Sequence, residues 1–166
     1  MGLDALLEAL EPLAAAADFR LMLVGDGPER NRLEGLARRG ALAQKVRFLG
    51  RLSDSDLALA YQAADLFVLP SYSEGFTTAI LEAMAAAVPV VATRVSAIPE
   101  IVADGMTGAL VAPGDDEAVA AALIELLGNP ERRRVLGEAG RERVRNDFSV
   151  ARMTDRTIAV YEGVAR

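Results

Sequence analysis

The apolar residues of this chain follow two different periods, which alternate from one segment to the next. Short runs of consecutive apolar residues predict buried strands, and apolar residues three or four apart predict helices. Strands are predicted at residues 19–24, 45–49, 66–69, 88–92 and 108–111. Helices are predicted at residues 3–17, 29–39, 54–63, from about 76, and at 98–103, 115–127, 131–146 and 149–166. This alternation predicts an α/β fold with a Rossmann-like, doubly wound parallel sheet and helices on both faces.

The boundaries between these elements carry residues with matching preferences. Ser53, Asp115 and Ser149 stand where helix N-caps are expected, and Gly140 marks a kink in the last helix but one. The arginines of residues 131–146 are interleaved with glutamates, which is typical of a solvated helix face. No linker or repeat interrupts the pattern, so residues 1–166 are expected to form one domain.

The amino-acid composition limits the partners and the types of catalytic site that this chain can have. The net charge of −6 argues against nucleic acid and anionic membranes as partners, because both select for basic surfaces. The chain contains no cysteine and no histidine, which excludes disulfides, thiol nucleophiles, Ser-His-Asp triads and Cys- or His-ligated metals. No metal site is indicated. No apolar run reaches transmembrane length and no basic-then-apolar leader opens the chain, so a cytoplasmic location is expected.

The most informative stretch is residues 71–86, which predicts a loop and a helix after a buried strand. Turns of this kind are where parallel α/β sheets hold their ligands. Glu74 stands in the loop and Glu82 in a helix of mostly apolar residues, and the helix N-terminus between them suits phosphate. Taken singly, Glu74 is better explained as a helix-start acid, and Glu82 as a solvent-facing residue of an amphipathic helix.

Other turns contain weaker candidates for ligand-binding residues. Gly25 and Gly27 flank a strand-to-helix turn where a phosphate could sit, although Pro28 makes an ordinary tight turn the better single explanation. Arg51 follows another strand, where an exposed loop residue is the plain alternative. Thr77 could donate a hydrogen bond to phosphate or bond back to its own helix.

The segment Glu74-Gly75-Phe76, four residues, then Leu81-Glu82-Ala83-Met84-Ala85 resembles the Glu-x7-Glu motif of family 4 retaining glycosyltransferases, the "glycosyl transferases group 1". The similarity continues through residues 88–93 and 99–102 and covers nearly the whole chain. It implies the donor-binding, C-terminal half of the two-domain GT-B fold. The donor would be a nucleotide-diphospho-sugar such as a UDP- or GDP-hexose, with no separate cofactor.

The resemblance also implies a role for each matching residue. Glu74 corresponds to the glutamate that contacts the donor sugar, and Glu82 to the one that holds the ribose hydroxyls. The remaining matches face the diphosphate and sugar (Gly75, Phe76, Thr77, Thr78), lie beside the base (Arg51, Leu52) or line the cleft (Gly25, Gly27). Four positions depart from the family, which usually has glycine in place of Thr77, Ala87, Ser96 and Ala97. Each adds a Cβ where backbone approaches a ligand or a neighbour.

The largest departure from the family sequence is at the start of the chain. Residues 2–7 resemble the family sequence just after a diphosphate-binding lysine, and Met1 stands in its place. The family's first strand, an arginine, that lysine and the acceptor-binding N-terminal domain are therefore expected to be missing. The resulting gap would expose strand edges and favour homo-oligomers. Residues 149–166 form the helix that would cross to the missing domain.

These implications lead to a specific expectation of function. The chain is expected to serve retaining transfer of a hexose, with little or no activity on its own, because each lost cation removes contacts worth about 1.5–3 kcal/mol. Two alternatives stay open: a non-catalytic, truncated or self-associating Rossmann-like domain, and another GT-B enzyme such as a sugar-nucleotide epimerase.

Overall fold

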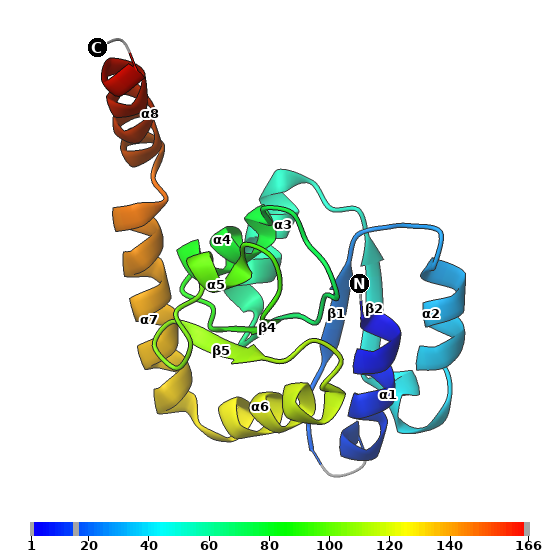
Figure 1. Cartoon of the computed structure of the whole chain (residues 1–166). Coiled ribbons are helices and arrows are strands. Elements are labelled where there is room, and N and C mark those ends of the chain that lie inside the picture. Colours follow the sequence, from blue (N-terminus) through cyan, green and yellow to red (C-terminus); the bar gives the residue numbers. More distant parts are fainter. Residues whose placement is uncertain (1, 15–16, 165–166) are drawn as a thin grey trace.

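A computed structural model of the chain describes residues 2–14 and 17–164. The strands are β1 (Leu21–Val24), β2 (Val46–Gly50), β3 (Phe67–Leu69), β4 (Val90–Thr93) and β5 (Gly108–Val111). The helices are α1 (Leu3–Ala14), α2 (Arg30–Ala37), the 3₁₀ helix η1 (Gly40–Gln44), α3 (Asp54–Ala63), α4 (Thr78–Ala85), α5 (Ile98–Ile101), α6 (Asp116–Gly128), α7 (Pro130–Asp147) and α8 (Val150–Val164) (Figure 1).

Every predicted strand and helix occurs, in the predicted order, with small differences at the ends. The first helix ends at Ala14; residues 15 and 16 lie outside the described part, and Ala17 is not helical. The helix η1 was not predicted. The predicted caps are present, because Ser53 and Asp115 accept hydrogen bonds from the amides of Asp56 and Ala118. Gly140 lies inside the single continuous helix α7.

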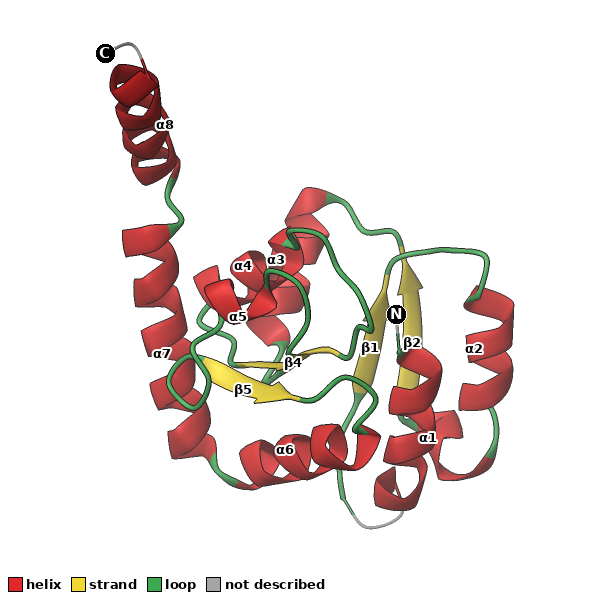
Figure 2. Cartoon of the chain, in the orientation of Figure 1, coloured by secondary structure: helices red, strands yellow, loops and turns green. Residues whose placement is uncertain are grey.

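All described strand pairs are parallel, which confirms the predicted fold class. The strands form two sheets and not one: β1 pairs with β2, and the other sheet has the order β3-β4-β5 (Figure 2). Leu21 lies opposite Val46 in the first sheet, and Phe67 opposite Val90 in the second. The sheet is thus interrupted between β1 and β3.

Hydrophobic packing joins the two sheets on one face. Leu6 and Leu10 of α1 share a core cluster with Leu23 of β1, Val68 of β3 and Leu123 of α6. Burial of these side chains supplies the free energy that holds the halves together in place of backbone pairing. A second core cluster fills the other face of β3-β4-β5, beneath α4 and α5.

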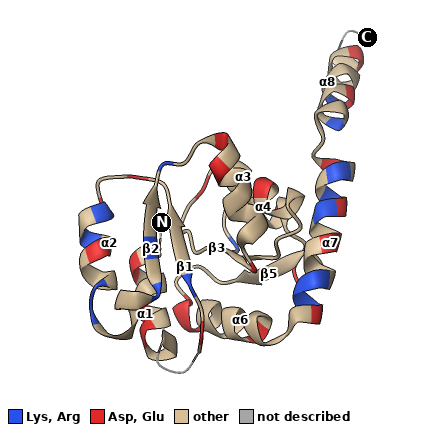
Figure 3. Ribbon diagram, turned by 180° about the vertical axis from the view of Figure 1, so that it is seen from behind, with Lys and Arg blue, Asp and Glu red and all other residues tan. Residues whose placement is uncertain are grey.

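The arginines of α7 do more than solvate a helix face, so that prediction was only partly right. Figure 3 shows basic and acidic residues interleaved along this helix. Arg133 donates to the carbonyl oxygens of Leu126 and Leu127 at 2.7 Å each, and Arg143 donates to those of Glu100 and Ile101. These carbonyls belong to the last turns of α6 and α5, where carbonyls lack the regular donor four residues further along the helix.

The last helix, α8, extends away from the body of the molecule (Figure 1). Each of its described residues is exposed, including the apolar Val150, Met153, Ile158 and Val160. Among the described helices, none is both long enough and apolar enough to cross a bilayer.

Candidate functional site

The predicted site residues follow the carboxyl ends of β1, β2 and β3 or lie on the helix after β3. Gly25 follows β1 and Arg51 follows β2, and the amide of Gly25 donates to the carbonyl of Gly50 at 2.8 Å. The loops after β1 and β2 therefore touch. The loop after β3 leads into α4 and carries Glu74.

Glu74 is held in its loop from two sides. The hydroxyl of the fully buried Ser71 donates to Glu74 Oε1 at 2.5 Å, and the amide of Glu74 donates to Ser96 Oγ at 3.4 Å. Thr93, at the end of β4, donates to the carbonyl oxygen of Ser71. The loop after β3 is thus fastened to the loop after β4, and the partly buried carboxylate of Glu74 is fixed in direction.

Glu82 lies on the exposed side of α4, while Ile80 and Met84 fill the core. Because Glu82 is exposed, α4 does not enclose its carboxylate. The hydroxyl of Tyr61 on α3 donates to Glu82 Oε2 at 3.1 Å and approaches the carbonyl of Ala79 at 3.3 Å. Burial raises the pKa of Tyr61 above its ordinary value, and the charge of Glu82 raises it further. Tyr61 is therefore a protonated donor that orients Glu82.

The start of α4 lies between the two glutamates. Thr77 is its N-cap, but its side chain makes no capping hydrogen bond. The first amides of an α-helix have no partner within the helix, and they carry the positive end of its dipole. Phe76, at 61% exposure, projects from the same loop. The arrangement offers donors for an anion, flanked by two carboxylates suited to hydroxyl groups.

Two of the four departures from glycine have unusual backbone geometry. Ala87 has φ 61° and Ser96 has φ 49°, both in the left-handed region that favours glycine. Thr77 and Ala97 have ordinary φ values of −93° and −81°. The added Cβ atoms therefore strain the backbone at Ala87 and Ser96, and not at the other two positions.

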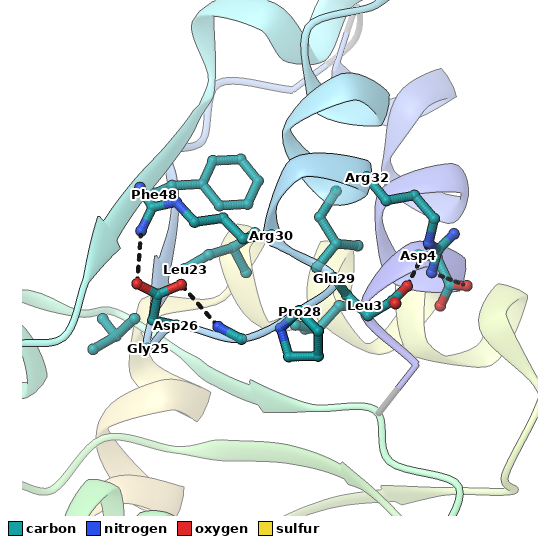
Figure 4. Close-up of a pocket in the computed structure, with 13 residues that line it drawn as sticks. Leu3, Asp4, Leu23, Gly25, Asp26, Pro28, Glu29, Arg30, Arg32 and Phe48 are labelled. Carbon is teal, nitrogen blue, oxygen red and sulfur yellow. Dashed lines mark hydrogen bonds and ion pairs between the residues drawn. The ribbon is translucent and has the colours of Figure 1, made fainter.

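A cavity of about 400 Å³ lies at the carboxyl end of β1 (Figure 4). Leu23 and Phe48 form part of its apolar wall, and Gly25 and Gly27 also line it. Its charged residues are already paired: Arg32 with Asp4 at 2.9 Å and with Glu29 at 2.6 Å, and Arg30 with Glu34 at 2.9 Å. The structure does not bring Arg51, Leu52 or the segment from Glu74 to Glu82 into the lining of this cavity.

Sequence reasoning missed the residues that support the two glutamates. Ser71 belongs to the central stretch but carries no signal of its own, and Tyr61 lies on a different helix. Ser96 was noted only as a departure from the family. Within residues 2–14 and 17–164, no group of three acidic side chains is close enough to hold a metal ion.

Comparison with known proteins shows which family the chain resembles. Residues 1–143 match the family described as "Glycosyl transferases group 1". The N-acetyl-alpha-D-glucosaminyl L-malate synthase of Bacillus anthracis is 36% identical over 160 residues, which are 96% of this chain and 42% of that protein. The sucrose-phosphate synthase of Thermosynechococcus elongatus has a TM-score of 0.87 and 35% identity, over 98% of this chain and 42% of that one.

A solved C-terminal domain is similar as well. The C-terminal domain of a glycosyl transferase group 1 family protein from Francisella tularensis has a TM-score of 0.81 and 28% identity, over 90% of this chain and 80% of that one. The chain spans less than half the length of the synthases of Bacillus anthracis and Thermosynechococcus elongatus.

Proposed function

This chain belongs to the glycosyl transferases group 1 family, and we propose that it is the nucleotide-sugar-binding half of a retaining glycosyltransferase that transfers a hexose. The observation that carries the proposal is the pair of oriented carboxylates around the start of α4. Ser71 fixes Glu74 on one side, and Tyr61 fixes Glu82 on the other. A bound sugar nucleotide needs both an anion site and acceptors for its hydroxyl groups, and this segment offers the two together.

In this proposal Glu74 accepts hydrogen bonds from hydroxyls of the donor sugar, and Glu82 accepts them from the ribose. The amides of residues 75–78 receive the diphosphate, where the dipole of α4 adds favourable charge. Arg51 and Leu52 lie beside the base, and Gly25 and Gly27 line the neighbouring wall. Retention of configuration and the hexose are part of the proposal.

The other half of the enzyme, which binds the acceptor, is proposed to come from a separate N-terminal domain, to which residues 149–166 would cross. Without that domain the chain is expected to bind donor and to transfer no sugar. The donor is proposed to be a UDP- or GDP-hexose. The relatives are named for several different glycosyl groups, so their names do not narrow the choice to one base or one sugar.

The test is calorimetric titration with UDP, GDP, ADP and their glucose, mannose and N-acetylglucosamine conjugates. Glu82→Gln is expected to weaken the binding of one nucleotide at least about tenfold, because a hydrogen bond to a charged acceptor is worth about 1.5–3 kcal/mol. Tyr61→Phe should weaken the binding of the same nucleotide by a smaller factor, since this variant leaves Glu82 charged but removes the hydroxyl that orients it.

The matched control is Glu125→Gln, which removes the same charge from an exposed position on α6. It should leave the affinity unchanged. Saturable binding that Glu82→Gln and Glu125→Gln affect equally would contradict the assigned role of Glu82. No binding of any nucleotide at millimolar concentration by the folded chain would contradict the proposed half-site.

A further inference from the structure

We propose that Ser96 is a positioning residue for recognition of the donor hexose, a role that rests on the proposed function and deepens it. The hydroxyl of Ser96 accepts a hydrogen bond from the amide of Glu74, and so it fixes the backbone of Glu74 from the turn after β4. The carboxylate of Glu74 can then meet a hydroxyl group of the sugar in one direction only. In this role Ser96 acts through Glu74.

The backbone of Ser96 has a conformation that serine rarely adopts. Its φ of 49° lies in the left-handed region. Ser96 is the second residue of a turn, which Ile98 closes by donating its amide to the carbonyl of Val95 at 3.1 Å. Glycine dominates turn positions with positive φ, because it has no Cβ to clash with the backbone. Strained residues cluster at functional sites, so the side chain of Ser96 requires an explanation.

The hydroxyl group supplies this explanation. Among the described residues, the one hydrogen-bond partner of the Ser96 hydroxyl is the amide of Glu74, at 3.4 Å and 22 positions earlier in the chain. Ser96 is exposed, so packing does not require its side chain. Alanine would suffer the same strain without the hydrogen bond, and glycine would avoid the strain. Serine differs from both through its contact with Glu74.

The turn that carries Ser96 is a rigid support. Ile98 and Ile101 of α5, which follows the turn, are both fully buried. Arg143 of α7 donates to the carbonyl oxygen of Ile101 at 2.8 Å and so holds the other end of α5. The loop before α4 is less well packed, since its Phe76 is 61% exposed. The hydroxyl of Ser96 therefore ties an exposed loop to a well-packed part of the molecule.

Glu74 is held at both of its ends. Ser71 donates to Oε1 of the carboxylate, and Thr93 of β4 holds Ser71 in turn. Ser96 holds the amide, so the side-chain torsion angles between these two anchors have little freedom. Within the described part of the chain, Oε2 of Glu74 accepts no hydrogen bond and is available for a sugar hydroxyl. A carboxylate that is oriented in advance loses less entropy when the sugar binds.

Two substitutions separate the hydroxyl from the strain. Ser96→Ala removes the hydroxyl and keeps a Cβ in the left-handed turn, whereas Ser96→Gly removes both. In the ligand-free chain, NMR should show the amide of Glu74 exchanging with solvent at least about threefold faster in both variants. Ser96→Gly should nevertheless unfold about 2–4 °C above Ser96→Ala, because glycine adopts the turn without strain.

Calorimetry measures what the hexose adds to the affinity. The ligands are whichever of UDP, GDP and ADP binds most tightly and its glucose, mannose and N-acetylglucosamine conjugates. Both variants should reduce the added affinity about threefold, as expected for one long, neutral hydrogen bond, and should leave the affinity for the nucleotide alone unchanged. The matched control is Ala87→Gly, which relieves a second left-handed residue beyond the end of α4 and should leave the added affinity unchanged.

Unchanged exchange of the Glu74 amide in both variants would overturn the proposal, whether or not a nucleotide binds. An unchanged hexose contribution in variants that still bind the nucleotide would also overturn it, and the proposed half-site would stand. A loss of added affinity in Ser96→Ala and not in Ser96→Gly would show that strain is responsible and positioning is not. An intact chain that binds no nucleotide at millimolar concentration would overturn both the half-site and this role.

Discussion

At the scale of single residues, Ala87 departs most clearly from what its backbone favours. It follows the last turn of α4, where the amide of Ala87 donates to Met84 and that of Val88 donates to Ala83, both at 2.9 Å. This is the Schellman arrangement, whose left-handed residue is usually glycine. Alanine adopts φ 61° there only with strain.

Ala87→Gly is therefore expected to stabilise the chain by about 1 kcal/mol, since it relieves the left-handed strain at the cost of a more flexible unfolded chain. Urea unfolding followed by circular dichroism measures the change. Ala121→Gly, in the exposed interior of α6, is the control and should destabilise by about 0.5–1 kcal/mol. A loss of stability in Ala87→Gly would show that the strain is not released.

A second residue makes stability depend on pH. The amide of Leu110 donates to Asp104 Oδ1 at 2.9 Å and Arg94 donates to Oδ2, and together they hold the pKa of Asp104 below its ordinary value. Because the folded pKa is lowered, the stabilisation is present above the unfolded pKa and is lost as the pH falls through the folded value.

Asp104→Asn should consequently reduce the free energy of unfolding at pH 7 by no more than about 1 kcal/mol, because the ion pair is half exposed. The difference from the unchanged chain should begin to shrink as the pH falls below about 4 and should vanish below the lowered folded pKa. Urea midpoints between pH 2 and 7 test this. A difference that stays constant over the whole range would mean that the charge of Asp104 is not responsible.

The two glutamates were predictable from the sequence, whereas their supports were not. Glu74 and Glu82 stand in a recognisable segment, and its strand-loop-helix context is local. Tyr61 reaches Glu82 across 21 positions and Ser96 reaches Glu74 across 22. Such pairs arise from how α3 packs beside α4 and how two loops meet, and no local pattern encodes either. The roles in donor binding stay predictions.

At the scale of elements, one close contact sets how α4 and α7 pack. A Cβ built on Gly137 of α7 would lie 2.0 Å from the carbonyl oxygen of Ala87. The helix can approach the end of α4 this closely only because residue 137 has no side chain. The sequence contains Gly137 inside an otherwise good helix, but the partner that requires it is visible only in the fold.

Gly137→Ala is expected to destabilise the chain by about 1–3 kcal/mol, because backbone and not a flexible side chain would have to move. The matched control is Gly35→Ala in α2, where an added Cβ meets nothing within 4 Å. That variant should be stabilised by about 0.5–1 kcal/mol through helix propensity. Thermal unfolding of both variants gives the comparison, and a shift of the same sign in the two would contradict the packing argument.

The main helices and strands could be predicted from the periodicity of the apolar residues. The short helix η1 and the contacts made by the arginines of α7 could not. The helix η1 is a single short turn, below the length at which a period can be recognised. The arginines of α7 alternate with glutamates in the sequence, which is typical of a solvated face. Arg133 and Arg143 nevertheless cap other helices, because tertiary packing brings the ends of α6 and α5 beside α7.

At the scale of the whole molecule, α8 buries none of its described residues against the rest of the chain. Removing residues 150–166 should therefore leave the free energy of unfolding unchanged within about 0.5 kcal/mol. In the intact chain the amides of α8 should exchange rapidly with solvent, unlike those of α7. A clear drop in the unfolding temperature after truncation would mean that α8 folds back onto the body in solution.

The interrupted sheet has a consequence for how cooperatively the molecule unfolds. Residues before α3 build one sheet with α1 and α2, whereas α3 packs beside α4 with the residues from β3 onward, so each half is nearly contiguous in sequence. No ladder of backbone hydrogen bonds runs through both. Their union depends on the side chains of the core cluster that α1 and α6 share. We therefore expect the halves to exchange amide hydrogens as two foldons, with the half that contains the Glu74 loop protected while the other opens.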